Sequence, residues 1–190
     1  MERLFVAIPL PDIIKQQLTF KHGGVPGARW QTVAQMHLTV RFIGEVDGAA
    51  AADIRGALSV IKGDPFSLEL AGCGTFGARG RERILWVGVK RCEALMQLRD
   101  RIEAALVREG LPPDRRKFHP HVTLARLKNP PKGRLNDFVA ANSFFQSPPF
   151  EVEEFNLFSS FRSQSGAIYS IEAEYPLGSL QPVAVEYALN

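Results

Sequence analysis

HPHVTLAR (residues 119–126) contains a His-x-Thr triplet at His121-Val122-Thr123, and HLTV (residues 37–40) contains a second one at His37-Leu38-Thr39. The chain has only 4 histidines in 190 residues, and two of them stand two residues before a threonine in an apolar run. Side chains at positions i and i+2 of a β-strand point to the same face. We therefore expect each triplet to lie on a strand with one packed apolar face and one His/Thr face.

The two triplets are 84 residues apart, and two other pairs of segments share this offset. FSLEL (66–70) precedes FEVEE (150–154), and ILWV (84–87) precedes IYSI (168–171), at the same spacing. Any one of these short matches could arise by chance, whereas three at one offset favour a duplicated unit. We therefore predict a single bilobal domain over residues 1–190, built from an internal repeat with an offset of about 84 residues.

The order of the predicted elements favours an α+β fold. Apolar and alternating runs predict strands over residues 3–9, 66–76, 83–89, 121–126, 150–158 and 167–175. Apolar stripes and end signals predict helices over residues 11–21, 47–62, 92–109 and 133–141. Hairpins of 65–75 with 82–90 and of 149–158 with 167–176 make the sheets antiparallel. We predict two lobes of antiparallel sheet, related by a pseudo-twofold axis, with flanking helices around a central cleft.

The composition is that of a globular protein with a mild basic bias. Hydrophobic residues make up 45% and charged residues 23% of the chain, with a formal net charge of +3 and a pI near 9.0, which is compatible with an anionic ligand. Cys73 and Cys92 form no CxxC pattern, as expected of reduced thiols in a cytoplasmic protein. The first apolar run stops at Pro9 and Pro11, too short for a membrane span or a signal peptide. We expect a cytoplasmic monomer without a membrane partner.

Two His/Thr faces that meet across one cleft would supply the groups for displacement at phosphorus. The attacking and leaving oxygens lie roughly in line, so one imidazole can accept a proton while another donates one. A histidine pKa near 6.5 makes both protonation states available near neutral pH, and threonine hydroxyls can donate to phosphate oxygens. Arg126 could neutralise the developing charge. Strict alternation puts it on the face opposite His121, so it reaches the cleft only if the strand bulges or ends there.

The residues alone leave other functions open. His119 and His121 could ligate a metal from one strand face, but no third ligand stands at a suitable spacing. A catalytically silent RNA- or nucleotide-binding module could use the same cleft, although binding alone does not require two imidazoles. Basic residues that flank the presumed cleft could form a track for an RNA backbone or an ordinary solvated surface. They are Arg79, Arg81, Arg83, Arg115, Arg116, Lys117, Lys128, Lys132 and Arg134.

HLTVRFIGEV (37–46) and HPHVTLARL (119–127) resemble the paired motifs of the two-histidine phosphoesterase superfamily, and more closely those of its 2′-5′ RNA ligase-like branch, the RNA 2′,3′-cyclic phosphodiesterases. The resemblance also includes the opening strand RLFVAI (3–8) and the closing segment 157–177. It implies a bilobal α+β fold and hydrolysis of 2′,3′-cyclic phosphates to 2′-phosphates without a metal or other cofactor. Several members also join RNA ends through 2′-5′ bonds. The implied partners are RNA ends or nucleoside 2′,3′-cyclic phosphates.

The resemblance also assigns roles to the two triplets. It places the catalytic histidines at His37 and His121 and the phosphate-binding threonines at Thr39 and Thr123. The residues themselves do not decide which histidine is the acid and which the base, because the two triplets look alike. The resemblance alone gives the acid role to His37 and the base role to His121.

Two further positions follow the triplets at equal spacing. The arginine after the second motif is Arg126, and the aromatic residue at the same place after the first is Phe42. The resemblance implies that this pair lies near the nucleoside, where Phe42 could stack on a base, while core packing is the alternative for this side chain. The segment 159–166, expected to be a loop, carries Arg162 at the mouth of the implied substrate site.

Overall fold

The structure is a computed structural model that describes residues 1–163 and 166–178. A sheet of eight strands runs through it, with the order β10-β9-β1-β3-β7-β6-β5 and with β2 paired to β7, and every strand pair in it is antiparallel. The strands are β1 (Glu2–Pro9), β2 (Ala28–Trp30), β3 (His37–Val46), β5 (Leu70–Ala78), β6 (Arg81–Val89), β7 (His121–Leu127), β9 (Glu154–Ser163) and β10 (Gly166–Pro176). The short strands β4 (Phe66–Leu68) and β8 (Phe150–Val152) form a separate pair.

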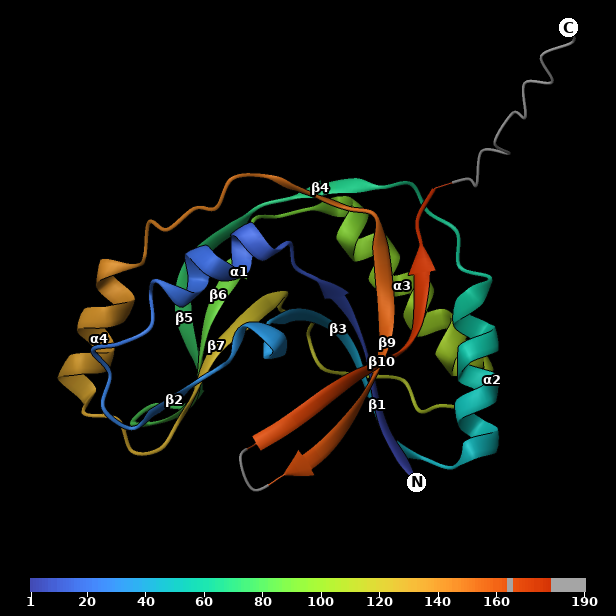
Figure 1. The fold of residues 1–190 in the computed structure, drawn as a ribbon, viewed down its shortest axis with the longest axis horizontal. Helices are drawn as coiled ribbons and strands as arrows, with labels where there is room; N and C mark the ends of the chain where they lie inside the picture. Colours follow the sequence, from blue (N-terminus) through green and yellow to red (C-terminus); the bar gives the residue numbers. More distant parts are fainter. Residues whose placement is uncertain (164–165, 179–190) are drawn as a thin grey trace, which may run out of the picture.

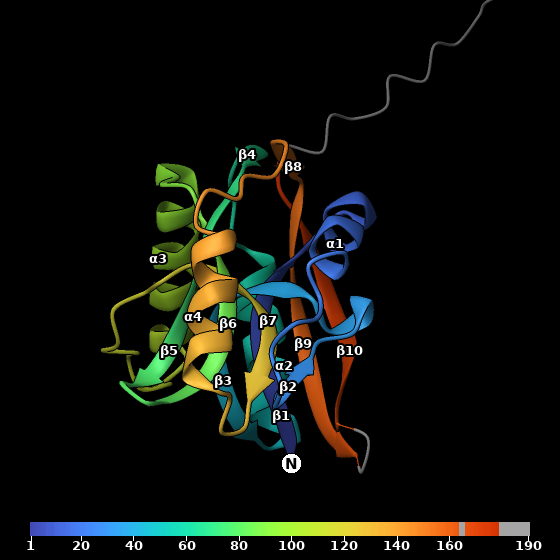
Figure 2. The ribbon, with the colours of Figure 1, turned by 90° about the vertical axis from the view of Figure 1, so that its left-hand side faces the viewer.

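Helices flank this sheet. They are α1 (Asp12–Thr19), α2 (Gly48–Ser59), α3 (Glu93–Arg108) and α4 (Lys132–Ala141), with a short 3-10 turn η1 (Val33–Gln35) before β3. Figure 1 shows α4 and α2 at opposite ends of the molecule, and Figure 2 shows α3 on the side away from β10. The predicted α+β class with antiparallel sheets is therefore confirmed. The backbone N–H of Ala50 donates to the Asp47 carboxylate (2.9 Å), so the predicted N-cap of α2 is confirmed as well.

The two halves of the sheet join at the two motif strands. β3 and β7 pair only at Leu38 and Val122, which are both fully buried and stand 84 residues apart. The small pair β4–β8 is likewise centred on Ser67 and Glu151, which are also 84 residues apart. If a twofold axis relates two copies of a unit, equivalent residues of the two copies pair with each other next to the axis. The internal repeat stays a prediction, which these two registers favour.

Three segments differ from the sequence-based expectation. Residues 66–76 and 150–158 were each expected to form one strand, but each is interrupted, at Glu69 and Glu153. The first parts of the two segments, β4 and β8, pair with each other, while the second parts, β5 and β9, belong to the large sheet. Each segment therefore changes its pairing partner at the interruption. The expected loop 159–166 is instead the end of a β9–β10 hairpin, and its residues Gln164 and Ser165 lie outside the described residues.

The apolar faces of the motif strands lie in one continuous core. This core also takes the predicted stripe of α3, whose five members are buried: Leu95, Leu98, Ile102, Ala105 and Leu106. Burial of one large apolar side chain is worth about 1.5–3 kcal/mol, so this packing holds the motif strands in place. Among the described residues, no helix is long and apolar enough to span a membrane.

Candidate active site

The predicted His/Thr faces meet where β3 joins β7. In an antiparallel pair centred on Leu38 and Val122, the neighbours His37 and Thr123 lie opposite each other, as do Thr39 and His121. Leu38 and Val122 point into the core, while the four polar side chains are partly exposed on the other face. The fold therefore brings both triplets together across a single strand junction.

A bulge follows the triplet in β3. The register with β1 passes from Thr39 directly to Arg41, so Val40 has no partner of its own. Val40 and Arg41 are both buried, and Phe42 returns to the His/Thr face with 54% of its surface exposed.

The same bulge follows the triplet in β7. Its register with β6 passes from Thr123 directly to Ala125, so Leu124 is the extra residue. Leu124 and Ala125 are both buried, and Arg126 is exposed on the His/Thr face. Strict alternation would turn Arg126 away from the His/Thr face. The bulge shifts the alternation by one residue, so the Arg126 side chain reaches the cleft.

A cavity of about 690 Å³ lies over this junction. It is lined by five of the six predicted site residues: His37, Thr39, Phe42, Thr123 and Arg126. The sixth, His121, lies on the same face of β7 and is close enough to contribute electrostatically to the lowered pKa of His37. Five arginines line the cavity, and no acidic residue of the described chain does, so the cavity favours an anion. These arginines are Arg3, Arg29, Arg116, Arg126 and Arg162.

His37 is enclosed by aromatic rings. The ring centroids of Phe5, Tyr169 and Phe158 lie 4.9, 5.2 and 5.9 Å from that of the imidazole, with Tyr169 presenting its edge. Burial in these surroundings lowers the pKa of His37 from 6.5 to about 4; a hydrogen bond to the Gln35 carbonyl raises it and His121 lowers it further. In the ligand-free protein His37 is therefore neutral near pH 7.

His121 has a related but different environment. Its Nδ1 lies 2.6 Å from the carbonyl oxygen of His119, and because a carbonyl can only accept, Nδ1 carries the hydrogen. Nε2 is then the nitrogen left for a ligand. The Phe76 ring meets the imidazole edge-on at 4.8 Å, and Trp86 lies 6.4 Å away. Burial lowers the pKa of His121, against the raising effect of the bond to His119.

The sequence analysis gave no role to Arg41, which the structure makes the centre of a buried charge network. Arg41 is 7% exposed, and its guanidinium donates to the Glu103 carboxylate (2.6 Å), the Pro112 carbonyl (2.7 Å) and the Phe42 carbonyl. The Asp114 carboxylate lies 3.9 Å away. A charged residue at the fifth position of HLTVRF was the available signal, but it predicts burial only once the bulge is known.

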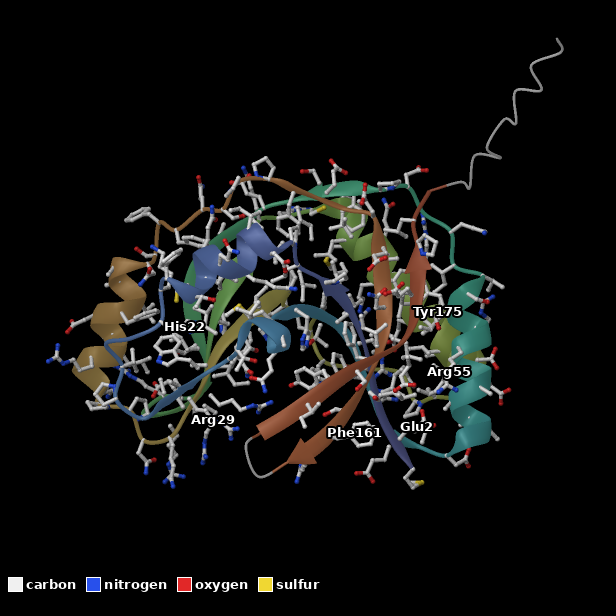
Figure 3. The ribbon with its side chains drawn as sticks, in the orientation of Figure 1. Glu2, His22, Arg29, Arg55, Phe161 and Tyr175 are labelled. Carbon is white, nitrogen blue, oxygen red and sulfur yellow. The ribbon has the colours of Figure 1, made fainter. Side chains whose placement is uncertain are left out.

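Other lining residues were also missed because they come from distant segments. Gln35 in η1 donates to the Ala167 carbonyl in β10 (2.6 Å), which ties the two walls of the cavity together. Arg29 extends from β2 toward the tip of the β9–β10 hairpin (Figure 3) and packs against Gly166, where an added Cβ would come within 2.1 Å of its guanidinium. Gly166 has a φ of 137°, which favours glycine, and the sequence contains no local signal for its contact with Arg29.

The structure also bears on two alternatives. Within residues 1–163 and 166–178, no three His, Cys, Asp or Glu side chains gather into a group that could hold a metal ion. A larger hollow of about 1050 Å³ lies beside α2 and the end of β10, and it contains none of the predicted site residues. We take the smaller cavity as the site, because convergent polar groups and perturbed histidines are found there.

Antiparallel strands that bring paired His-x-Thr motifs together beside one cavity are the arrangement that the resemblance to two-histidine phosphoesterases implies. Residues 28–164 match the family model of the "2'-5' RNA ligase superfamily". The chain belongs to this family, and the resemblance noted in the motifs is confirmed.

Relatives from several organisms carry one name. The chain is 31% identical to the "RNA 2',3'-cyclic phosphodiesterase" of Archaeoglobus fulgidus over 172 residues, which cover 88% of this chain and 96% of the relative. It is 32% identical to the protein of the same name from Thermotoga maritima, covering 89% and 92%. The matches to the proteins of that name from Aeropyrum pernix (44% identical) and Geobacillus stearothermophilus (39%) span only 61% and 41% of those relatives.

Solved structures share the fold over nearly the whole chain. The crystal structure of Escherichia coli LigT complexed with 3'-AMP superposes with a TM-score of 0.75 at 26% identity, covering 94% of this chain and 99% of LigT. The Thermus thermophilus protein TT0787 superposes with a TM-score of 0.76 at 25% identity, covering 92% and 97%.

Proposed function

We propose that this chain is a metal-independent RNA 2′,3′-cyclic phosphodiesterase that hydrolyses a 2′,3′-cyclic phosphate to a 2′-phosphate. The observation that carries the proposal is the junction of β3 and β7, which puts two imidazoles and two threonines on one face, beside an arginine-lined cavity. The names of the relatives from A. fulgidus and T. maritima support this activity.

In the proposed reaction, water attacks phosphorus and forms a new P–O bond while the P–O3′ bond breaks. One histidine accepts the proton that the water loses, and the other donates a proton to O3′, so the product is a 2′-phosphate. Thr39 and Thr123 donate to the non-bridging oxygens. Arg126 neutralises the charge that develops on them.

The resemblance assigns the acid role to His37 and the base role to His121, and the pKa of His37 adds a condition. A neutral His37 can act as the acid only if it takes up a proton with the substrate. A bound phosphate would favour this uptake, because a negative charge close to the imidazole stabilises its protonated form. The proposal therefore includes proton uptake on substrate binding.

Phe42 and Arg126 form the proposed nucleoside side of the site. The exposure of Phe42 and its place in the cavity lining support stacking on a base over packing in the core.

In 2′-5′ ligation an RNA hydroxyl would replace the attacking water, and the same two histidines would serve. We keep a cytoplasmic setting and a monomeric state as parts of the proposal, and the free thiols of Cys73 and Cys92 support a reducing compartment.

The decisive experiment is incubation of the purified chain with adenosine 2′,3′-cyclic phosphate, with and without EDTA, followed by ³¹P NMR. We expect a 2′-phosphate product at the same rate in both samples. Binding without turnover would favour the catalytically silent nucleotide-binding module. Activity that EDTA removes and a divalent ion restores would favour a metal-dependent hydrolase.

A further inference from the structure

A second hollow lies next to the active-site cavity, at the far end of β6 and β7. It has a volume of about 310 Å³ and is lined by Gly80, Arg81, Glu82, Arg83, Asn129 and Pro130. We infer that this distal hollow binds a backbone phosphate of the single-stranded RNA whose cyclic end occupies the cavity. The inference rests on the proposed function and adds a contact that only an RNA longer than a mononucleotide can make.

The distal hollow continues directly from the cavity along two paired strands. Ile84 of β6 pairs with Arg126 of β7, and both line the cavity. Along β6, the residues next to Ile84 are those of the hollow, and along β7 the chain reaches Asn129 three residues after Arg126. Three residues of strand span about 10 Å. The next phosphates of a strand anchored in the cavity therefore come within reach of the hollow.

A bulge in β6 turns a basic side chain of the hollow onto the face of the active site. The register with β5 passes from Ile84 directly to Glu82, so Arg83 is the extra residue. This shift puts Arg81 on the same face as Ile84, where strict alternation would put it on the other. The bulge depends on Gly77, which has a φ of 136° and where a Cβ would lie 2.6 Å from the Arg81 carbonyl oxygen.

The charges of the hollow suit an anion. Within the described part of the chain, neither Arg81 nor Arg83 takes part in an ion pair. The single acid, Glu82, accepts from the Gly80 backbone N–H (2.9 Å), and this bond and the nearby Lys132 help to lower its pKa, so Glu82 stays ionised. The two guanidinium groups of Arg81 and Arg83 outweigh this one carboxylate, and the lining keeps a net positive charge. Asn129 adds an amide donor from a left-handed backbone position (φ 47°), which asparagine tolerates well.

The other basic cluster fits this role less well. Arg116, the member of the Arg115–Lys117 run that lines the cavity, is held by two hydrogen bonds to the Asp114 carboxylate (2.8 and 2.7 Å). Its charge is therefore largely compensated within the protein. The free guanidinium groups of the distal hollow are the better candidates for release of counterions from an RNA backbone.

The test compares two substrates and two variants. Arg81→Gln/Arg83→Gln removes both positive charges of the hollow. The control, Arg79→Gln, removes an exposed positive charge from the same hairpin tip but outside the hollow. Each protein is assayed with a mononucleoside 2′,3′-cyclic phosphate and with a ten-nucleotide RNA that carries the same end. Binding of a ten-nucleotide RNA with a 2′-phosphate end is measured by fluorescence anisotropy across a salt series.

We expect the double variant to hydrolyse the mononucleotide at the wild-type rate and to raise KM for the ten-nucleotide RNA about 3- to 10-fold. Its slope of log K against log salt should become shallower by about 0.7 for each lost phosphate contact. Unchanged RNA binding, or an equal change in the Arg79→Gln control, would overturn the inference. If the wild type hydrolyses neither substrate, the proposed function fails, and the anisotropy data alone then decide whether the hollow binds RNA.

Discussion

The strands HLTVRF (37–42) and HVTLAR (121–126) follow the same backbone path and differ in what they present at its end. Both bulge after the threonine and bury two successive residues. At the fifth position the first strand buries Arg41 and the second buries Ala125, and at the sixth they expose Phe42 and Arg126. A common backbone thus presents one imidazole from each strand, while the sixth position adds an aromatic side chain from the first strand and a cationic one from the second. The proposed substrate carries both a base and a phosphate, which suit these two side chains.

Removal of either imidazole should have the largest effect, because the proposed acid and base act in the same step. We expect His37→Ala and His121→Ala each to lower kcat for a mononucleoside 2′,3′-cyclic phosphate by ~10²-fold or more, and the double variant to lose far less than the product of the two. The measurement is steady-state kinetics, with circular dichroism to verify folding.

His119→Asn is the matched control for this pair. The His119 side chain is exposed, and the hydrogen bond of His121 goes to the His119 backbone carbonyl, which asparagine retains. We expect substantial activity in this variant. A loss as severe as that of His121→Ala in a folded His119→Asn protein would add His119 to the catalytic set, and near wild-type turnover in either alanine variant would refute the acid/base pair.

The residue at the fifth position, Arg41 in the first strand and Ala125 in the second, should contribute differently to the free energy of unfolding. Arg41→Met removes the guanidinium partner of the Glu103 carboxylate, which is 14% exposed and keeps the Asp114 backbone N–H as a donor (2.7 Å). Removal of one member of a buried ion pair costs about 3–5 kcal/mol, and we expect a loss at the lower end of this range. Adding Glu103→Leu should recover part of this loss, because Asp114 keeps its pair with Arg116. Urea unfolding of the wild type and the two variants measures the free energies. A loss below about 1 kcal/mol for Arg41→Met would show that the network contributes little.

The residues at the sixth position, Phe42 and Arg126, should affect the binding of different ligands. Arg126→Gln removes a charge-assisted contact, worth about 1.5–3 kcal/mol, and should weaken binding of both inorganic phosphate and 2′-AMP. Phe42→Leu removes a stacking surface, worth about 1–3 kcal/mol per base, and should weaken only the nucleotide. Isothermal titration calorimetry with the two ligands distinguishes these outcomes. Equal losses for both ligands in Phe42→Leu would contradict a stacking role.

The sequence was sufficient to predict the elements with a strong local pattern and the site residues that repeat. The α3 stripe, the Asp47 cap and the two hairpins all follow from short-range periodicity. The bulges could not be located, because an extra residue in a strand leaves no distinct local signature. Their positions decide that Arg126 faces the cavity and that Arg41 is buried. The contacts of Gln35 and Arg29 join segments more than 130 residues apart, which no local pattern encodes.

The smallest predicted effect concerns the unequal surroundings of the two histidines. It is measured as the pH dependence of the free energy of unfolding. The pKa of His37 is about 4 in the folded protein and near 6.5 in the unfolded chain. Between these values the unfolded state binds more protons, so the contribution of His37 to stability is fully present above pH 6.5 and is lost as the pH falls toward 4.

We expect the free energy of unfolding to fall by about 1 kcal/mol between pH 7 and pH 5.5 through His37 alone. His37→Asn should flatten this slope in urea unfolding, while the contributions of His22 and His121, whose pKa values burial also lowers, remain. Saturating inorganic phosphate should flatten the wild-type slope as well, because a bound anion raises the pKa of the folded form. If wild type and His37→Asn lose stability equally over this range, His37 is already protonatable in the ligand-free site, and proton uptake with substrate is not required for its acid role.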